Sequence, residues 1–203
     1  MHPNPAFRGV EAARSLDFAR EEAFGVLTMA GAEGPLASHL PFVLNEAGDR
    51  LAVHIVRSNP IWKALRGGPL DAVMIVSGPH GYISPDWYGA ADQVPTWNYV
   101  AVHLRGTARL LDEGAMRGHV DDLSEQFEAR LAPKPIWRSE KMDQEAMARM
   151  MRMLAPVEMV VSDIQSTWKL NQNKPEAARL GAAEGVEEQG NAALAALMRD
   201  PPA

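Results

Sequence analysis

Short apolar segments follow one another closely in this sequence and are separated by turn-forming residues. Several strand-like segments lie in the first half of the chain, and the links between them are rich in Gly, Pro, Asn and Asp. Segment 99–104 alternates between Val or Leu on one face and Tyr, Ala or His on the other, as in a strand with one buried face. This succession favours an antiparallel barrel over a parallel sheet with crossover helices. The expected strands are 24–29, 36–44, 51–56, 70–77, 99–104 and 157–170.

Helical periodicity precedes and interrupts these strands. Apolar residues recur at three- and four-residue steps over 10–23, and two further helices are predicted within 116–131 and 147–154. We interpret the methionines of the helix predicted within 147–154 as core residues that fill irregular gaps. We therefore expect a single domain over residues 1–203, with a helical insertion at about 113–155 and a C-terminal helix at about 186–199.

Composition excludes several classes of function. The chain has no cysteine, so disulfides, thiolate metal sites and cysteine nucleophiles are absent. No apolar run approaches the roughly 18–20 residues that span a bilayer, and the N-terminus lacks a secretory pattern, so we expect a cytoplasmic protein without a membrane partner. The formal net charge of -6 argues against direct DNA binding, because phosphate contacts require a basic face.

Several common motifs are missing. No strand is followed by G-x-G-x-x-G or a P-loop, and no G-x-S-x-G elbow is present. The histidines show no H-x-x-x-H or H-E-x-x-H spacing, so no metal site is predicted. Haem ligation by a single histidine remains a remote alternative.

Three segments could carry chemistry. Residues 77–88 and 94–99 read as a rigid aromatic loop that suits stacking on a planar ligand or a subunit interface, or simply caps the barrel end. Residues 54–63 run from a strand into a helix that Asn59 caps, with cations and a hydroxyl that could bind phosphate; an ordinary capped helix is the alternative. Residues 165–175 are rich in amide and hydroxyl groups, and could contact the polar edge of a flavin or form a solvated turn.

These segments also contain motifs in an order that is unlikely to arise by chance. The motifs are Ala37-Ser38-His39-Leu40-Pro41, Arg57-Ser58-Asn59-Pro60-Ile61-Trp62, Gly78-Pro79-His80-Gly81-Tyr82-Ile83-Ser84-Pro85-Asp86-Trp87-Tyr88, Val94-Pro95-Thr96-Trp97-Asn98-Tyr99 and Lys169-Leu170-Asn171-Gln172-Asn173.

With these motifs the sequence resembles the PaiB-like family of FMN-binding negative transcriptional regulators, within the FMN-binding split-barrel superfamily. The resemblance covers most of the chain and implies a mainly β (α+β) fold, an antiparallel split β-barrel with flanking helices. It also implies FMN as the cofactor and a homodimer with two FMN sites at the subunit interface. Departures from the family pattern are small: Gly81 and Asp86 in the aromatic motif, and Asn171 where a serine is often expected.

The resemblance also assigns roles to individual residues. The turn at Arg57, Ser58 and Asn59, with Lys63 behind it, would hold the phosphate. Ser38 and His39 would lie along the isoalloxazine ring. Trp97 and Asn98 would reach the FMN from the partner chain. Lys169 and Asn171 would complete the polar rim of the FMN site.

Two functions fit such a protein. The first is a flavin-dependent regulatory protein, in which FMN or its redox state sets a conformation that another molecule reads. The second is an FMN-dependent oxidoreductase that uses a reduced nicotinamide and a small-molecule substrate. The flavin would carry the chemistry, so the sequence identifies no catalytic residue, although His39 is the first candidate for proton delivery.

Overall fold

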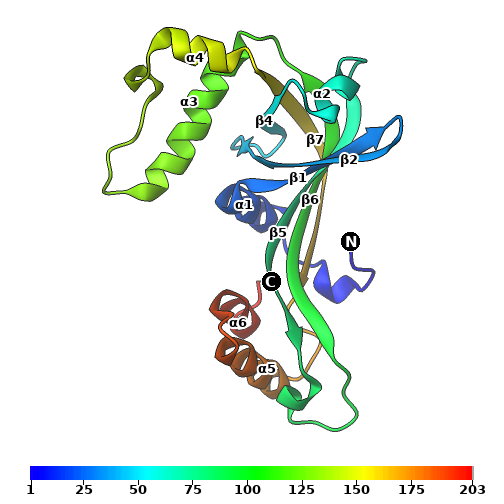
Figure 1. Ribbon diagram of the computed structural model, residues 1–203. Coiled ribbons are helices and arrows are strands. Elements are labelled where there is room, and N and C mark those ends of the chain that lie inside the picture. Colours follow the sequence, from blue (N-terminus) through cyan, green and yellow to red (C-terminus); the bar gives the residue numbers. More distant parts are fainter. Residues whose placement is uncertain (203) are drawn as a thin grey trace. The chain divides into compact units, whose positions relative to one another are not determined.

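The computed structural model of the protein describes residues 1–202. Its main element is a sheet of seven strands in the order β2-β1-β5-β6-β7-β4-β3, with β2 and β3 as the two edges (Figure 1). β1 pairs antiparallel with β2 and β5, and β4 pairs antiparallel with β3 and β7. The strands are β1 (Phe24–Gly31), β2 (Gly34–Pro41), β3 (Val43–Leu44), β4 (Arg50–Val56), β5 (Leu70–Ile83), β6 (Thr96–Leu110) and β7 (Leu154–Lys169).

Helices precede, interrupt and follow the strands. The α-helices are α1 (Ala12–Glu22), α2 (Pro60–Leu65), α3 (Ala115–Glu128), α4 (Gln144–Met151), α5 (Glu176–Glu188) and α6 (Ala192–Arg199). The short 3-10 helices are η1 (Pro5–Phe7), η2 (Pro85–Tyr88), η3 (Ala129–Leu131) and η4 (Ser139–Lys141). Within residues 1–202, no helix has both the length and the apolar character needed to cross a membrane.

The chain divides into two compact units, which are described separately. Unit 1 comprises residues 1–18, 77–103 and the described residues from 165 onward, and unit 2 comprises residues 19–76 and 104–164. The strands β5, β6 and β7 each contribute residues to both units. Helices α5 and α6 belong to unit 1, whereas α2, α3 and α4 belong to unit 2.

The core of unit 2 follows from the period-two alternation of its strands. Leu27 and Met29 of β1 are buried, whereas Val26 and Thr28 are partly exposed. A slip of one residue would move every buried side chain to the other face. Full burial of an aliphatic side chain contributes about 1.5–3 kcal/mol, so this face fixes the register of the sheet. The buried residues of β4 and β5 in this unit are Leu51, Val53, Ile55, Ala72, Met74 and Val76.

The strand expected at 36–44 is divided into β2 and β3. Phe42 lies between them and is fully buried. Its backbone N–H donates to the Ala23 carbonyl at 2.9 Å rather than to a neighbouring strand. Ala23 has φ 50°, in the left-handed region, which turns the chain from α1 into β1. The burial of Phe42 therefore interrupts a segment whose apolar pattern looked continuous.

β5 extends to Ile83, which corrects the interpretation of 77–88 as an aromatic loop. A Cβ atom at Gly78 would lie 2.5 Å from Phe18 Cζ and 3.0 Å from Val100 Cβ. Gly78 is therefore required by close packing within unit 1 and not by a turn. β6 likewise begins at Thr96, so the part of 94–99 that was expected to be loop is mostly strand.

Only part of the apolar face predicted for α3 and α4 is buried. Met116 of α3 and Met147 of α4 are buried, but Met150 is 51% exposed. The interpretation of the methionines of α4 as core is therefore wrong for Met150. α4 has eight residues, about two turns, and so short a helix can bury only a narrow face.

Unit 1 is held together by two tryptophans. A Cβ atom at Gly185 of α5 would lie 2.4 Å from Trp87 Cδ2, so the indole of η2 packs directly on the helix backbone. Trp168 is fully buried, and its Nε1 donates to Ser15 Oγ at 3.2 Å. The region where one helix was expected, 186–199, contains the end of α5 and all of α6. Between these helices, Gly190 has φ 84°.

Candidate functional site

The predicted site residues fall into two groups, one in each unit. Each group is described within its own unit. Unit 2 contains Ser38, His39, Arg57, Ser58, Asn59 and Lys63, and unit 1 contains Trp97, Asn98, Lys169 and Asn171.

In unit 2, four of the predicted residues lie in the turn from β4 into α2, residues 57–63, which we name the α2 corner. Asn59 caps α2, because its Oδ1 accepts a hydrogen bond from the Ile61 N–H at 2.9 Å. Pro60 takes the first helical position, where an N–H would have no helical partner. The predicted cap is confirmed, and it fixes the direction in which the chain leaves β4.

The Arg57 side chain is already engaged at the α2 corner. Its Nε donates to the Arg152 carbonyl at 2.9 Å, and its Nη2 donates to Glu113 Oε1 at 2.8 Å. Its guanidinium also lies 5.9 Å from the centroid of the Trp62 ring. A guanidinium has five N–H donors, so these contacts leave donors for a further anion.

Ser58 and Lys63 supply unused donors at the α2 corner. Within residues 1–202, neither the Ser58 hydroxyl nor the Lys63 ammonium has a hydrogen-bond or ion-pair partner. The backbone N–H groups of Trp62 and Lys63 donate to the Asn59 carbonyl at 3.0 and 3.4 Å. A phosphate at this corner would therefore be held by side chains. One guanidinium, one ammonium and one hydroxyl form a donor set that suits a phosphate monoester.

Ser38 and His39 of β2 occupy different surroundings. Ser38 Oγ accepts a hydrogen bond from Asn59 Nδ2 at 3.1 Å, which connects β2 to the α2 corner. The exposed His39 ring stacks on Phe24 of β1, with 6.5 Å between centroids and 29° between the planes. Successive side chains of a strand point to opposite faces, so the structure brings Ser38 but not His39 to the cap.

In unit 1, Trp97 and Asn98 differ in accessibility. Trp97 is 55% exposed, and its ring lies 6.3 Å from that of His80 and 6.4 Å from that of Tyr82. These rings on β5 and β6 form an aromatic surface suited to a planar molecule. Asn98 is 0% exposed, and within residues 1–202 neither polar atom of its side chain has a hydrogen-bond partner. Asn98 is therefore a buried polar group that the described chain leaves unsatisfied.

The polar run after β7 is folded into unit 1, so the alternative of a solvated turn is wrong for its central residues. Lys169 Nζ donates to Thr96 Oγ1 at 2.5 Å, and burial lowers the pKa of Lys169. Asn171 is buried, and its φ of 64° is one that Asn tolerates better than most residues. Burial raises the pKa of Tyr88, and the Asn171 side chain partly opposes this shift.

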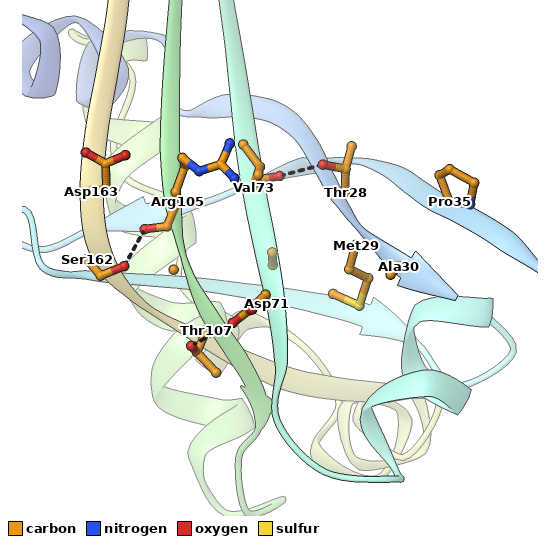
Figure 2. Close-up of a pocket in the computed structure, with 12 residues that line it drawn as sticks. Thr28, Met29, Ala30, Pro35, Asp71, Val73, Arg105, Thr107, Ser162 and Asp163 are labelled. Carbon is orange, nitrogen blue, oxygen red and sulfur yellow. Dashed lines mark hydrogen bonds between the residues drawn. The ribbon is translucent and has the colours of Figure 1, made fainter. Parts of the chain in front are cut away.

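A surface depression of unit 2 contains none of the predicted site residues. It has a volume of about 520 Å³ and is lined by residues of β1, β2, β5, β6 and β7 (Figure 2). Its charged lining residues Asp71, Arg105 and Asp163 are exposed. Thr107 Oγ1 donates to Asp71 Oδ1 at 3.4 Å. The two-residue spacing of Arg105 and Thr107 in β6 could have indicated that this face of the strand is polar.

A histidine pair that joins β4 to α3 follows no pattern in the sequence. His54 Nδ1 and His119 Nε2 lie 3.1 Å apart, so one of the two nitrogens carries the shared proton. Burial lowers the pKa of His54. Burial and the neighbouring His54 lower the pKa of His119 to about 4. Within the described part of the chain, no group of three or more His, Asp or Glu residues is placed to hold a metal ion.

Comparison with known sequences identifies the family. Residues 1–163 match the sequence model of the family described as "Putative FMN-binding domain". The chain belongs to this FMN-binding family. A second match is the "Protease synthase and sporulation protein PAI 2" of Bacillus subtilis (strain 168), which is 30% identical over 199 residues, covering 96% of this chain and 94% of that protein. The resemblance to the PaiB-like family and the prediction of FMN as cofactor are confirmed.

Solved structures of other proteins share the fold. The FAD and haem binding protein from Mycobacterium smegmatis has a TM-score of 0.55 at 17% identity, covering 80% of this chain and 73% of that chain. The flavocytochrome Anf3 from Azotobacter vinelandii has a TM-score of 0.56 at 14% identity, covering 83% and 72%. At these identities the likeness shows the fold alone. It confirms the antiparallel split barrel with flanking helices.

Proposed function

We propose that this chain is a flavin-dependent regulatory protein, in which bound FMN sets a conformation that another molecule reads. One observation carries the proposal. Arg57, the cation expected at the FMN phosphate, donates hydrogen bonds to Glu113, just before α3, and to the carbonyl of Arg152 at the C-terminal end of α4. A ligand that engages this guanidinium therefore acts on the contacts that hold a helical segment. The name of the Bacillus relative, which refers to sporulation, agrees with a regulatory role.

The phosphate of FMN would be held by the side chains of the α2 corner. The Arg57 guanidinium supplies remaining donors, and Ser58 and Lys63 supply a hydroxyl and an ammonium without partners in the described chain. Asn59 acts indirectly, because it orients both the start of α2 and the Ser38 hydroxyl. Charge-assisted hydrogen bonds are about twice as strong as neutral ones, so Arg57 and Lys63 would contribute most of the phosphate affinity.

Bound FMN supplies an isoalloxazine ring that accepts and releases electrons. The chain would orient this ring and limit its contact with water. Ser38 lies next to the α2 corner and can donate to or accept from a polar edge. Trp97, with His80 and Tyr82 beside it, offers an exposed aromatic surface for a flat ring. We keep Lys169 and Asn171 as the residues proposed for the polar rim of the FMN site.

We also propose a homodimer, in which the strand that carries Trp97 and Asn98 in one copy reaches the FMN of the other. The exposed Trp97 ring supports this arrangement, since large aromatic side chains are enriched at the centres of protein interfaces. Asn98 is enclosed within unit 1, so its contact with FMN would require a local rearrangement. The net charge of -6 favours a protein or small molecule over DNA as the reader of the FMN-bound state.

An FMN-dependent oxidoreductase is the second candidate, and one observation favours it. The His39 side chain is exposed on the edge strand β2, where a small substrate could reach it. An exposed imidazole can deliver a proton to a substrate that bound flavin reduces. In this case a reduced nicotinamide would supply the electrons.

Titration with FMN, followed by fluorescence quenching, tests the phosphate assignment. The double variant Arg57→Ala, Ser58→Ala should bind FMN about 10- to 150-fold more weakly. This range corresponds to the loss of one charge-assisted contact, which contributes about 1.5–3 kcal/mol. Arg66→Ala is the matched control, because Arg66 also lies over the Trp62 ring, at 5.2 Å, but outside the turn. Equal FMN affinity of the double variant and the unchanged chain would contradict the assignment.

Addition of NADH or NADPH to the FMN-bound protein separates the two candidate functions. After this addition a regulatory protein should keep its flavin absorption at about 450 nm, whereas an oxidoreductase should lose it rapidly because the flavin becomes reduced. The same spectrum tests the remote haem alternative, because bound haem would give an intense band at about 400 nm.

A further inference from the structure

One arginine at the α2 corner connects both ends of the helical segment between β6 and β7. We define this segment as residues 113–152, which include α3 and α4. Arg57 donates to the carboxylate of Glu113, two residues before α3, and to the carbonyl of Arg152, the C-cap of α4. The Arg57 side chain is 31% exposed and that of Glu113 is 79% exposed. The charged contact is therefore open to an incoming anion.

Several of the remaining contacts between the α3–α4 segment and the rest of unit 2 are polar. His119 of α3 bonds to His54 of β4, and Gln126 Nε2 donates to the Phe42 carbonyl at 3.2 Å. Met116 and Met147 of this segment are buried, but Met150 of α4 is 51% exposed, so the apolar surface of the segment is only partly buried. A segment with few buried apolar contacts opens locally at low free energy. The Arg57 contacts therefore matter for how firmly this segment is held.

Glu113 and a phosphate require the same cation. The carboxylate lies 2.8 Å from Arg57 Nη2, so a phosphate bound to the same guanidinium would stand close to a like charge. Repulsion between two anions at such separations is substantial near a protein surface. The Arg152 contact is different, because a carbonyl is uncharged and uses a separate N–H.

We infer that Glu113 is an internal competitor for the cofactor phosphate, so that FMN binding displaces Glu113 from Arg57 and releases the start of α3. The α3–α4 segment would then report whether the α2 corner is occupied. The inference rests on the proposed function, in that it takes the α2 corner as the FMN phosphate site. Glu113 acts through Arg57 and is a positioning residue, not a catalytic one. The His54–His119 contact limits the release to the first turns of α3.

FMN titration of the variant Glu113→Gln tests the competition. The substitution keeps the size of the side chain and removes its charge, and FMN should bind about two- to fivefold more tightly, the range expected for loss of an exposed ion pair. Riboflavin, which lacks the phosphate, should bind the variant and the unchanged chain equally. The gain for FMN should shrink at high salt, because exposed charges are screened.

Glu145→Gln is the matched control. Glu145 lies in the same segment and is exposed, and it pairs with Arg149 at 3.9 Å, so the variant changes the net charge equally without touching Arg57. Its FMN affinity should match that of the unchanged chain. Unchanged affinity in Glu113→Gln, or an equal gain in Glu145→Gln, would overturn the competition. FMN binding that is insensitive to Arg57→Ala would instead overturn the proposed phosphate site.

Hydrogen exchange supplies a second readout, which a purely structural role of Glu113 would not produce. On addition of FMN to the unchanged chain, backbone amides in the first turns of α3 should exchange faster, while those of β1 stay protected. In Glu113→Gln these amides should exchange fast already without FMN. Slower exchange of α3 on FMN binding would overturn the inference, even if FMN affinity responds to the substitution.

Discussion

Acidification from about pH 7 to about pH 4 should destabilise the protein through the buried His54–His119 pair. Both histidines have lowered pKa values in the folded chain, and that of His119 falls from 6.5 to about 4. The unfolded chain therefore binds protons more readily than the folded chain over this window. The stability that the neutral pair contributes is fully present above about pH 6.5 and is lost progressively as the pH falls towards about 4.

The magnitude follows from the size of the His119 shift. Each unit of pKa shift corresponds to about 1.4 kcal/mol, so a fall from 6.5 to about 4 would correspond to about 3 kcal/mol. Partial access of water to the pair reduces this to about 2–3 kcal/mol. Urea denaturation at pH 7 and near pH 4 measures the free energy of unfolding at each end of the window. Because the pair joins α3 to β4, the α3–α4 segment should also lose amide protection first.

Carboxylates of the unfolded chain begin to bind protons near the lower end of this window, so the comparison needs variants. Glu158 and Asp121 also have lowered pKa values, and they contribute equally to the unchanged chain and to His119→Gln. The unchanged chain should lose about 2–3 kcal/mol more than His119→Gln on acidification. His80→Gln, which removes an exposed histidine, should keep the full loss. An identical loss in the unchanged chain and in His119→Gln would refute the reasoning.

Two substitutions test the packing of the sheet and the buried amide. Gly106→Ala would place a Cβ 1.9 Å from the Val160 carbonyl oxygen, a backbone atom that cannot move without disturbing β7. It should cost more than about 3 kcal/mol or prevent folding, and a near-native melting temperature would contradict the strand geometry. Asn98→Leu replaces a fully buried side chain whose polar atoms have no partner among residues 1–202, so without FMN it should stabilise the chain by about 1–3 kcal/mol. A loss of stability in urea would mean that the amide has partners after all.

The sequence predicted those parts of the fold that are determined within a few residues, such as strand alternation and helix caps. The alternation around Val100 and the capping pair Asn59 and Pro60 correspond to β6 and the start of α2, because side-chain period and capping are set within a few residues. The loop interpretation of 77–88 is wrong at Gly78, because the role of this glycine depends on Phe18, which packs against it from a distant part of the sequence. Composition alone does not distinguish a glycine needed for a turn from one needed for close packing.

The candidate site was predictable as a set of donors but not as a network. Arg57, Ser58 and Lys63 lie close together in the sequence, so their place at or next to the turn from β4 into α2 follows from local structure. The partners of Arg57 do not, because Glu113 is 56 residues away. The contact between His54 and His119 spans 65 residues and follows no motif spacing. These pairings depend on how α3 docks on β4, which is decided by tertiary packing.

The way α3 docks also indicates which part of unit 2 can respond to a cofactor. The strand core around Leu27 and Met74 is held by full burial, where each side chain contributes about 1.5–3 kcal/mol, and a change at one exposed ion pair cannot shift it. The α3–α4 segment is held in part by ionisable contacts, at Arg57 and at His54, that a phosphate or a proton can alter. A change of about 1.4 kcal/mol there shifts a local equilibrium tenfold. A signal from bound FMN would therefore appear in this segment while the barrel stays unchanged.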